Sequence, residues 1–502
     1  MNSLVVPSNH RSMMLMASVG FASLMALGLL SLSGIQGSNS SSKRRTGRRK
    51  QGRRRRKVYL RGLYNLGNTC FLNSTLQSLA SLNAFNLYVK QCIELLAESN
   101  GDSVDAGIVI QLNKVLDQLE PRDSHVKALS PRDLISSLSY KGQWIASRNE
   151  QDAQELFQML SSTLQTVARK ADGSLLGALN TNQPIGNGFI STNHQQQQQQ
   201  AADTKQERRA SNPAPENPLL GMAASRTACV RCGYIEAIRH STFDNLSLTV
   251  PRAHVTTIEE CLAMYTAMDR LDDFCCRHCS IVATLARVKR DLAEYQTQPA
   301  NSDRSSKKAK RMVAQLSEQQ HMLEEALANN PEAELKGIEL SRPPPSTSTR
   351  QTMIARPPKI LALHLSRSIY LPTGGTAKNP ACVRLERLLD ISPFTTTGHI
   401  STIASAPISG PSLAASSYSR ESLAEIRHRN CLYLLNAVVV HSGAHDSGHF
   451  YAYRRIEVDP DADPLLGSSD QWFMISDTSA VEVPLDTVLS AGNGYLVFYE
   501  RI

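Results

Sequence analysis

The residue best placed to act as a nucleophile is Cys70. It follows a run rich in the turn formers glycine and asparagine and precedes apolar residues at helical spacing, so a loop should enter a helix at this point. Unpaired N–H groups and the positive end of the helix dipole stabilise a thiolate there. The side-chain amide of Asn65 is close enough in sequence to donate to an oxyanion in front of the sulfur. A cysteine on a helix is by itself more often part of a core, so the surrounding sequence has to decide.

Three histidines near the end of the chain compete for the role of general base. His441 ends a strand predicted over 433–440, where local packing is expected, and His445 lies in a polar loop. His449 follows a glycine and opens a strand of alternating aromatic residues, which can fix its ring. His449 is therefore the predicted base. His364, in an earlier strand, is expected to be a structural hydrogen-bonding residue.

Two CxxC pairs could hold a metal ion. Four thiolates are the donor set of tetrahedral zinc. The separation between the pairs exceeds the usual zinc-ribbon range, so on spacing alone buried thiols remain the alternative. The four residues are Cys229, Cys232, Cys276 and Cys279. Cys275 is a competing ligand, and His278, inside the second pair, is expected to be solvated.

Composition points to a reducing compartment and to a local role for the basic residues. The formal net charge is +9, but residues 43–57 hold 11 Lys and Arg, so the rest of the chain, with 43 basic and 45 acidic residues, is nearly neutral. This argues against nucleic-acid binding by the folded part. Ten cysteines in 502 residues do not form a disulfide framework.

The N-terminus is predicted to hold a membrane anchor. Residues 12–35 carry no charged side chain, and the apolar stretch 13–32 approaches the roughly 20 residues that span a bilayer. The positive-inside rule keeps the following basic residues, and everything after them, in the cytosol. We therefore expect an anchor over 1–35 and a basic juxtamembrane linker over 36–57. A cleaved signal peptide and a nuclear localisation signal are the alternative interpretations.

Residues 58–502 form the predicted catalytic domain. The first part of this domain is mainly helical by periodicity, and apolar runs later in the chain are predicted strands. Three stretches are predicted insertions. Residues 171–217 lose periodicity and are predicted to be disordered, residues 288–350 are predicted to be a helical insertion followed by a linker, and the Ser-, Ala- and Gly-rich residues 397–420 are predicted to be a loop.

Four segments resemble the ubiquitin-specific proteases, the papain-like deubiquitinases. They are the Cys box from Gly62 to Leu82, the run Asn149-Glu-Gln-Asp-Ala-Gln-Glu-Leu-Phe157, the segment from Pro357 to Arg367, and Gly448-His449-Phe450. The resemblance implies an α+β fold, a papain-like cysteine protease with thumb, palm and fingers subdomains. The sequence adds an N-terminal transmembrane helix to this fold.

The resemblance also implies roles outside the catalytic pair. In this family a Gln-Asp pair helps to hold the extended tail of ubiquitin, a role carried here onto Gln151 and Asp152. That tail, Leu-Arg-Gly-Gly, is basic and offers backbone donors, which suits a carboxylate. The two CxxC pairs would hold a structural zinc ion at the tips of the fingers. Glu150 stands where the family has Gln, and Phe450 where it has Tyr.

The residue that orients the histidine departs from the family pattern. Most members place Asp or Asn four residues after the tryptophan that corresponds to Trp472, and here that position is Ser476. Adjacent strand residues point to opposite faces, so Ser476 and Asp477 cannot both face His449 without a bulge. Ser476 is therefore the predicted third catalytic residue, and Asp477 is expected behind the site or on its oxyanion side.

Together these features predict a thiol-dependent deubiquitinase that hydrolyses the peptide or isopeptide bond after the C-terminal glycine of ubiquitin. The N-terminal span, the basic stretch and Ser476 resemble the mitochondrial outer-membrane member of the family, so that membrane is the predicted location. The endoplasmic reticulum is the alternative location. A ubiquitin-binding pseudo-protease and a protease for a ubiquitin-like modifier are the alternative functions.

Overall fold

The structure is a computed structural model, and the part of the chain it describes begins at Lys57. The predicted span 13–32, Gln151 and nearly all of the predicted insertion 171–217 lie outside this part. The described ranges contain no helix with both the length and the apolar character of a membrane span. The residues that the structure describes are 57–99, 103–141, 152–171, 215–297, 307–342, 345–396, 401, 403–409, 430–445, 447–457 and 470–502.

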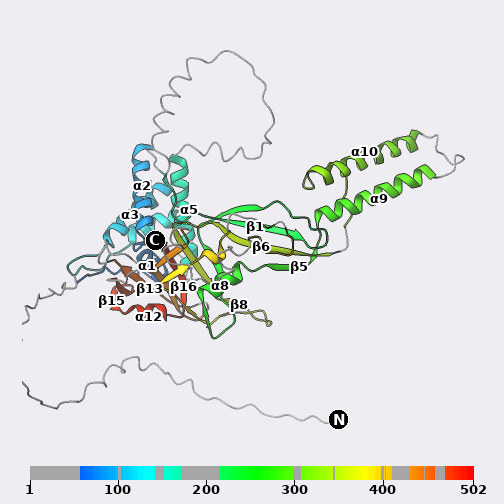
Figure 1. Cartoon of the computed structure of the whole chain (residues 1–502). Helices are drawn as coiled ribbons and strands as arrows, with labels where there is room; N and C mark the ends of the chain where they lie inside the picture. The colour runs from blue at the N-terminus through cyan, green and yellow to red at the C-terminus, as the bar shows by residue number, and fades with distance from the viewer. Residues whose placement is uncertain are drawn as a thin grey trace, which may run out of the picture. The chain divides into compact units, whose positions relative to one another are not determined.

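A helical layer forms the first part of the domain, as the periodicity predicts. Figure 1 shows these helices grouped together in blue and cyan. They share one apolar core with residues from the neighbouring sheet, including Val439 and Phe498. The helices are α1 (Cys70–Leu79), α2 (Asn83–Ser99), α3 (Val104–Gln118), α4 (Arg132–Lys141) and α5 (Ala153–Ala171).

Helix α1 lies in the centre of this layer, and all ten of its residues are buried. It packs against α3 and α5 on the helical side and against three strands of the sheet, β12, β13 and β14. Its hydroxyl side chains satisfy themselves locally: Thr75 donates to the carbonyl of Phe71 at 2.7 Å, and Ser78 to that of Ser74 at 3.0 Å. These bonds let a helix with many polar residues sit inside an apolar core.

The main sheet lies beneath the helices, in the order β15-β14-β13-β12-β16-β7-β3, with β11 also pairing with β12. Only the β3–β7 pair is parallel. Strand β12 is apolar on both faces because alternate residues enter two cores: Val439 contacts the helical core, and Val440 a second core behind the sheet. The strands are β3 (Leu246–Thr249), β7 (Ile360–Ser366), β11 (Leu388–Asp390), β12 (Leu432–Gly443), β13 (Gly448–Ile456), β14 (Gln471–Ser476), β15 (Ser479–Val483) and β16 (Gly494–Arg501).

A second sheet, in the order β2-β1-β6-β5, leads to a pair of long helices that pack against each other (Figure 1). Helices α9 (Arg277–Thr297) and α10 (Lys307–Asn329) separate β5 from β6 in the chain. Ile281, Val288, Leu316 and Leu323 form their shared core. The strands are β1 (Gly221–Cys229), β2 (Arg239–Phe243), β5 (Asp269–Phe274) and β6 (Ser346–Arg356).

Shorter elements complete the fold. Beside the main sheet lie α8 (Ile258–Tyr265), α12 (Leu485–Leu489), a 3-10 turn η2 (Ser392–Phe394), and the strands β4 (Val255–Thr257), β8 (Ser368–Tyr370), β9 (Thr376–Lys378) and β10 (Cys382–Arg384). Helices α1 to α5 therefore precede the strands of both sheets, and the remaining helices lie between strands, in agreement with the predicted α+β class. The predicted transmembrane helix lies outside the described residues.

Candidate active site and cysteine cluster

Cys70 is the first residue of α1 and is 5% exposed. The turn before it requires left-handed backbone at Gly67 (φ 103°) and Asn68 (φ 52°), which glycine and asparagine tolerate best. The side-chain oxygen of Asn65 accepts from the backbone N–H groups of Gly67 at 3.1 Å and Thr69 at 3.0 Å. Asn65 thus stabilises the turn before α1. The helix begins at Cys70 directly after this turn, as the sequence predicts.

His449 and Ser476 lie on the paired strands β13 and β14. The Ser476 hydroxyl lies 2.8 Å from Nε2 of His449. With Nε2 engaged, Nδ1 is the ring nitrogen that can exchange a proton with a thiol. Both strands pack against α1, so the sheet carries this pair toward the helix that begins at Cys70.

Asp477 turns away from His449. It follows the last residue of β14 with a left-handed backbone, φ 47°. Its carboxylate accepts from the side-chain amides of Asn65 at 3.1 Å and Asn73 at 2.7 Å. Asp477 therefore lies on the side of the predicted oxyanion donor, and Asn65 keeps a second amide N–H that can serve a substrate oxygen.

The turn at Asp477 is also fixed through the backbone. The N–H of Leu63 donates to the carbonyl of Asp477 at 2.8 Å. At Gly62 a Cβ atom would lie 2.5 Å from the Cα atom of Thr478, so only glycine lets the two segments approach this closely. The loop before α1 and the end of β14 are therefore held as one unit.

The other three histidines considered from the sequence, His441, His445 and His364, have different surroundings. His441 is 7% exposed, and its ring stacks on Phe450 with 4.5 Å between ring centroids. The ring of His445 lies 3.0 Å from the Ser368 hydroxyl. Nδ1 of His364 lies 2.9 Å from the Ser247 hydroxyl, and burial lowers the pKa of this histidine. Of the four candidate histidines, all described in the structure, only His449 is hydrogen-bonded to Ser476.

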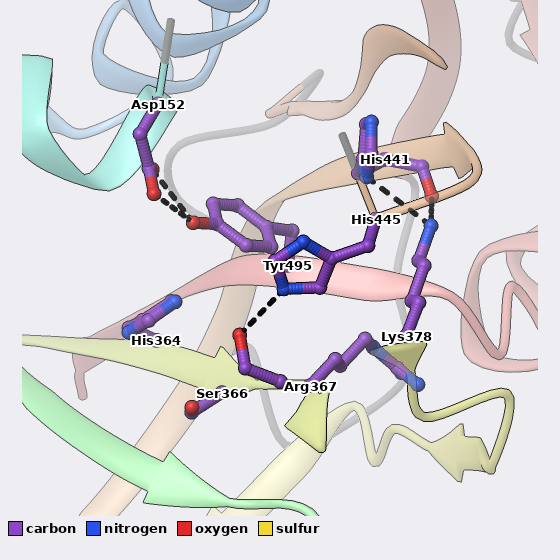
Figure 2. A pocket seen from close by; sticks show the side chains of 9 residues that line it. Asp152, His364, Ser366, Arg367, Lys378, His441, His445 and Tyr495 are labelled. Carbon is purple, nitrogen blue, oxygen red and sulfur yellow. Dashed lines mark hydrogen bonds between the residues drawn. The ribbon is translucent and has the colours of Figure 1, made fainter. Parts of the chain in front are cut away.

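A cavity of about 150 Å³ lies between the helical layer and the sheet. The Tyr495 hydroxyl lies 2.6 Å from both carboxylate oxygens of Asp152, which is the residue just before α5. Burial and this carboxylate raise the pKa of Tyr495, so the phenol stays protonated and acts as the donor. Figure 2 shows this contact, and Lys378 reaching the backbone of His441. The lining residues are Asp152, His364, Ser366, Arg367, Ser368, Lys378, His441, His445 and Tyr495.

The four predicted metal ligands come together in space. Cys229 ends β1 and Cys232 follows in a turn, whereas Cys276 precedes α9 and Cys279 lies in its first turn. Their sulfur atoms lie within 4.8 Å of one another, and those of Cys232 and Cys276 are 3.7 Å apart. Four ligands at about 2.3 Å from a tetrahedral zinc ion would lie about 3.8 Å from one another. The cluster therefore fits such an ion.

The electrostatics of the cluster also suit a cation. Burial acts to raise the pKa of Cys229, but hydrogen bonds from Ser346 and from the backbone of the turn outweigh it and lower that pKa to about 6. Burial and the neighbouring Cys232 raise the pKa of Cys279 to about 11. One thiolate is thus stabilised by the protein itself, and a divalent cation would stabilise the others.

Two residues next to the cluster do not belong to the ligand set. The Cys275 sulfur lies 3.4 Å from Nε of Arg342 and outside the group of four. His278, predicted to be solvated, is half-buried: its ring stacks on Tyr234 with 5.4 Å between centroids, and its Nδ1 atom is buried. The CxxC spacing alone does not reveal this stacking contact.

Sequence reasoning missed Asn73 and Tyr495. Asn73 is buried on α1, 2% exposed, but Ser74 and Thr75 follow it, so the sequence does not single it out. Tyr495 is the second residue of β16, and its partner Asp152 lies 343 residues away, so no local pattern connects them.

The sequence model of the ubiquitin carboxyl-terminal hydrolase family matches residues 61–499. The chain belongs to the ubiquitin carboxyl-terminal hydrolase family. The predicted family is thereby confirmed, and with it the class of enzyme, a ubiquitinyl hydrolase. The match begins before the Cys70 turn and ends after Tyr495, so it includes every described residue of the site.

Individual relatives agree with this assignment. Ubiquitin carboxyl-terminal hydrolase 30 of Xenopus tropicalis is 28% identical over 479 residues, that of Homo sapiens 26% over 502, and that of Mus musculus 24% over 500. The alignments cover 89% of this chain and 82–85% of those proteins. The fold is similar to a solved SAGA Ubp8/Sgf11/Sus1/Sgf73 DUB module bound to ubiquitin aldehyde, with a TM-score of 0.51 and 17% identity over 88% of this chain and 70% of that one.

For this ubiquitin carboxyl-terminal hydrolase, we expect Ser476→Ala to lower kcat by about 10- to 100-fold. This loss is smaller than the rate enhancement that a general base itself can supply. The substitution removes the group that holds the imidazole. Asp477→Ala should have a smaller effect, because Asn65 stays anchored to Gly67 and Thr69 through its own oxygen. Turnover of a fluorogenic ubiquitin C-terminal amide measures both. A larger loss in Asp477→Ala would contradict the assignment of Ser476 as the third catalytic residue.

We expect the wild-type protein to bind one zinc ion per chain. Cys229→Ser or Cys276→Ser should abolish zinc binding and lower the unfolding temperature, because metal binding is coupled to folding. Cys275→Ser is the matched control, because it removes an adjacent thiol outside the cluster and should keep the metal. Elemental analysis of each purified full-length variant measures the zinc. A wild-type protein without zinc, or loss of zinc in the control, would refute the ligand set.

Proposed function

We propose that the chain is a membrane-held deubiquitinase that hydrolyses the bond after the C-terminal glycine of ubiquitin, with Cys70 as nucleophile and His449 as acid–base. The observation that carries this proposal is the 2.8 Å contact between Ser476 and His449 on strands that pack against the helix of Cys70. A thiol at a helix start beside an oriented imidazole is the arrangement of a cysteine protease.

The reaction is an acyl transfer. His449 takes the proton of Cys70, and the thiolate attacks the carbonyl carbon of the terminal glycine. An amide N–H of Asn65 and backbone N–H groups at the start of α1 stabilise the oxyanion. The imidazolium then protonates the departing lysine amine, which leaves a thioester. His449 next accepts a proton from water, whose hydroxide displaces Cys70 and releases the ubiquitin carboxylate.

The cavity between α5 and the sheet is the proposed site for the extended ubiquitin tail. Asp152 offers a carboxylate there, which the Tyr495 hydroxyl holds in place. A fixed anion suits a tail that carries arginine and presents backbone N–H groups. Gln151, the other residue predicted to bind the tail, lies outside the described residues but immediately precedes Asp152 in the chain.

The cysteine cluster is the proposed site of a structural zinc ion. It joins the end of β1 to the start of α9, two segments that lie far apart in the sequence. A zinc ion would thereby fix the end of the second sheet, the proposed fingers that grip ubiquitin. It would supply structure only, since the proposed chemistry belongs to Cys70 and His449.

The proposed location is the mitochondrial outer membrane, with the N-terminus inside the organelle and the catalytic domain in the cytosol. Support comes from the sequence: the uncharged segment 13–32 is followed by 11 basic residues within 43–57. The moderate hydrophobicity of that segment favours mitochondria over the endoplasmic reticulum, the alternative location. The domain boundaries proposed above, 1–35, 36–57 and 58–502, follow from the same pattern.

The catalytic proposal predicts that a ubiquitin with a C-terminal electrophile labels the full-length chain on Cys70. Cys70→Ala should abolish both labelling and turnover, whereas Cys275→Ser, a control thiol outside the site, should keep both. A panel of electrophilic ubiquitin-like modifiers decides the substrate. Preference for another modifier, or ubiquitin binding without any labelling of the wild type, would favour the alternative functions.

The membrane proposal predicts that protease added to intact mitochondria removes residues 58–502, because these face the cytosol. A truncated chain that starts near Arg44 should lose its attachment to the organelle. Immunoblotting of the mitochondrial fraction, with a matrix protein as the protected control, measures both. Protection of the catalytic domain in intact organelles would refute the topology.

A further inference from the structure

Arg454 is a buried charge that the proposed mechanism does not use. It lies on β13, the strand that begins at Gly448 and carries His449, and is 2% exposed. Its guanidinium donates to the backbone carbonyls of Ala80 and Leu119, each at 2.9 Å, and to the side-chain oxygen of Gln77 at 3.2 Å. None of these three partners is a carboxylate.

The two carbonyls explain how this charge is accommodated. Ala80 is the C-terminal cap of α1, and Leu119 is that of α3. Helix C-termini present unsatisfied carbonyls and the negative end of the helix dipole, which stabilise a cation. The charge of the Glu120 carboxylate also favours the charged form of Arg454. Burial lowers the pKa of Arg454 to about 10, which leaves it charged at neutral pH.

Gln77 extends these contacts to a third segment. Its amide accepts from Arg454 through the oxygen and donates through the nitrogen to the carbonyl of Arg61 at 2.7 Å. Two residues further on, the N–H of Leu63 binds the carbonyl of Asp477. One guanidinium therefore connects the strand of the base, the helix of the nucleophile and the segment that holds the oxyanion side.

Given the cysteine-protease function proposed above, on which this depends, we propose that Arg454 is a positioning residue for the reaction. Arg454 joins the C-terminal end of α1 to β13 and so fixes the position of α1 along its own axis. This position determines where Cys70, at the other end of α1, lies relative to His449. Core packing alone would be served by a long apolar side chain such as methionine, because burying a charge costs free energy that a methionine would not incur. The carbonyl contacts instead fix the helix along its own axis, which apolar contacts specify less sharply.

The test compares Arg454→Met with Arg455→Met in the full-length protein. Arg455 is the next residue on β13, and its side chain is 9% exposed. It donates to Asn436 at 2.9 Å and to Asp470 at 3.1 Å rather than to α1. Both substitutions remove a nearly buried guanidinium from one strand. Arg455→Met also takes an ion-pair partner from the buried Asp470 carboxylate, so it should lower the unfolding temperature at least as much. Only Arg454→Met should change the relation between α1 and β13.

We expect Arg454→Met to lower kcat by about 10- to 100-fold, the effect of a small misplacement of reacting groups, at nearly unchanged KM. Arg455→Met should retain kcat within about twofold of wild type under the same conditions. Arg454→Lys should recover part of the loss, because its ammonium keeps the charge and can reach one of the two carbonyls. The measurement is turnover of a fluorogenic ubiquitin C-terminal amide, at a temperature where each variant is folded.

Two results would overturn the proposal: a kcat for Arg454→Met equal to that of the wild type, or equal losses of kcat in the two methionine variants. If Arg454→Met does not fold, Gln77→Met decides, since a lower kcat at constant KM supports the proposal and a wild-type kcat refutes it. Failure of the proposed function would be distinct, because the wild type itself would then show no turnover.

Discussion

The buried contact between α1 and the main sheet is the constraint on which the site depends. The proposed nucleophile, Cys70, begins a helix and the proposed base, His449, lies on a strand, so neither element can place both groups. Their distance is set by how the two pack, and α1 is buried along its whole length, with helices on one side and β12, β13 and β14 on the other. A close-packed interior leaves little freedom to slide or rotate. The site thus inherits its geometry from the core.

Buried arginines that bind backbone carbonyls join distant segments elsewhere in this fold as well. Arg367 donates to the carbonyls of Gly494 and Gly492, and also to those of Asn379 and Ala381. Arg226 donates to Ser401 at 2.6 Å and to Ala406. Each guanidinium offers five donors in a fixed plane, so it can satisfy several loop or helix-end carbonyls at once. Backbone segments that are distant in the sequence are in this way held to one another.

Local patterns predict the parts of the site that local rules govern. Turn formers before an apolar helical run place Cys70 at a helix start, and a glycine before alternating aromatic residues places His449 at a strand start. Strand alternation predicts that Ser476 and Asp477 point in different directions; in the structure β14 ends at Ser476, and the left-handed backbone of Asp477 separates them. Partnerships across hundreds of residues, such as that of Asp152 with Tyr495, follow from topology and have no local signal. His278 shows the same limit, since it stacks on Tyr234, which is distant in the sequence.

The separate positions of Ser476 and Asp477 divide two tasks between a neutral and a charged group. The Asp477 carboxylate accepts hydrogen bonds from the side-chain amides of Asn65 and Asn73, and so orients Asn65, the proposed oxyanion donor. A carboxylate in place of Ser476 would put a negative charge against Nε2 and stabilise the imidazolium. The Ser476 hydroxyl can hold the ring through Nε2, 2.8 Å away, but it stabilises an imidazolium less than a carboxylate does. A thiol at a helix start ionises more readily than a serine hydroxyl, so the proposed nucleophile, Cys70, needs less support from its base than a serine would.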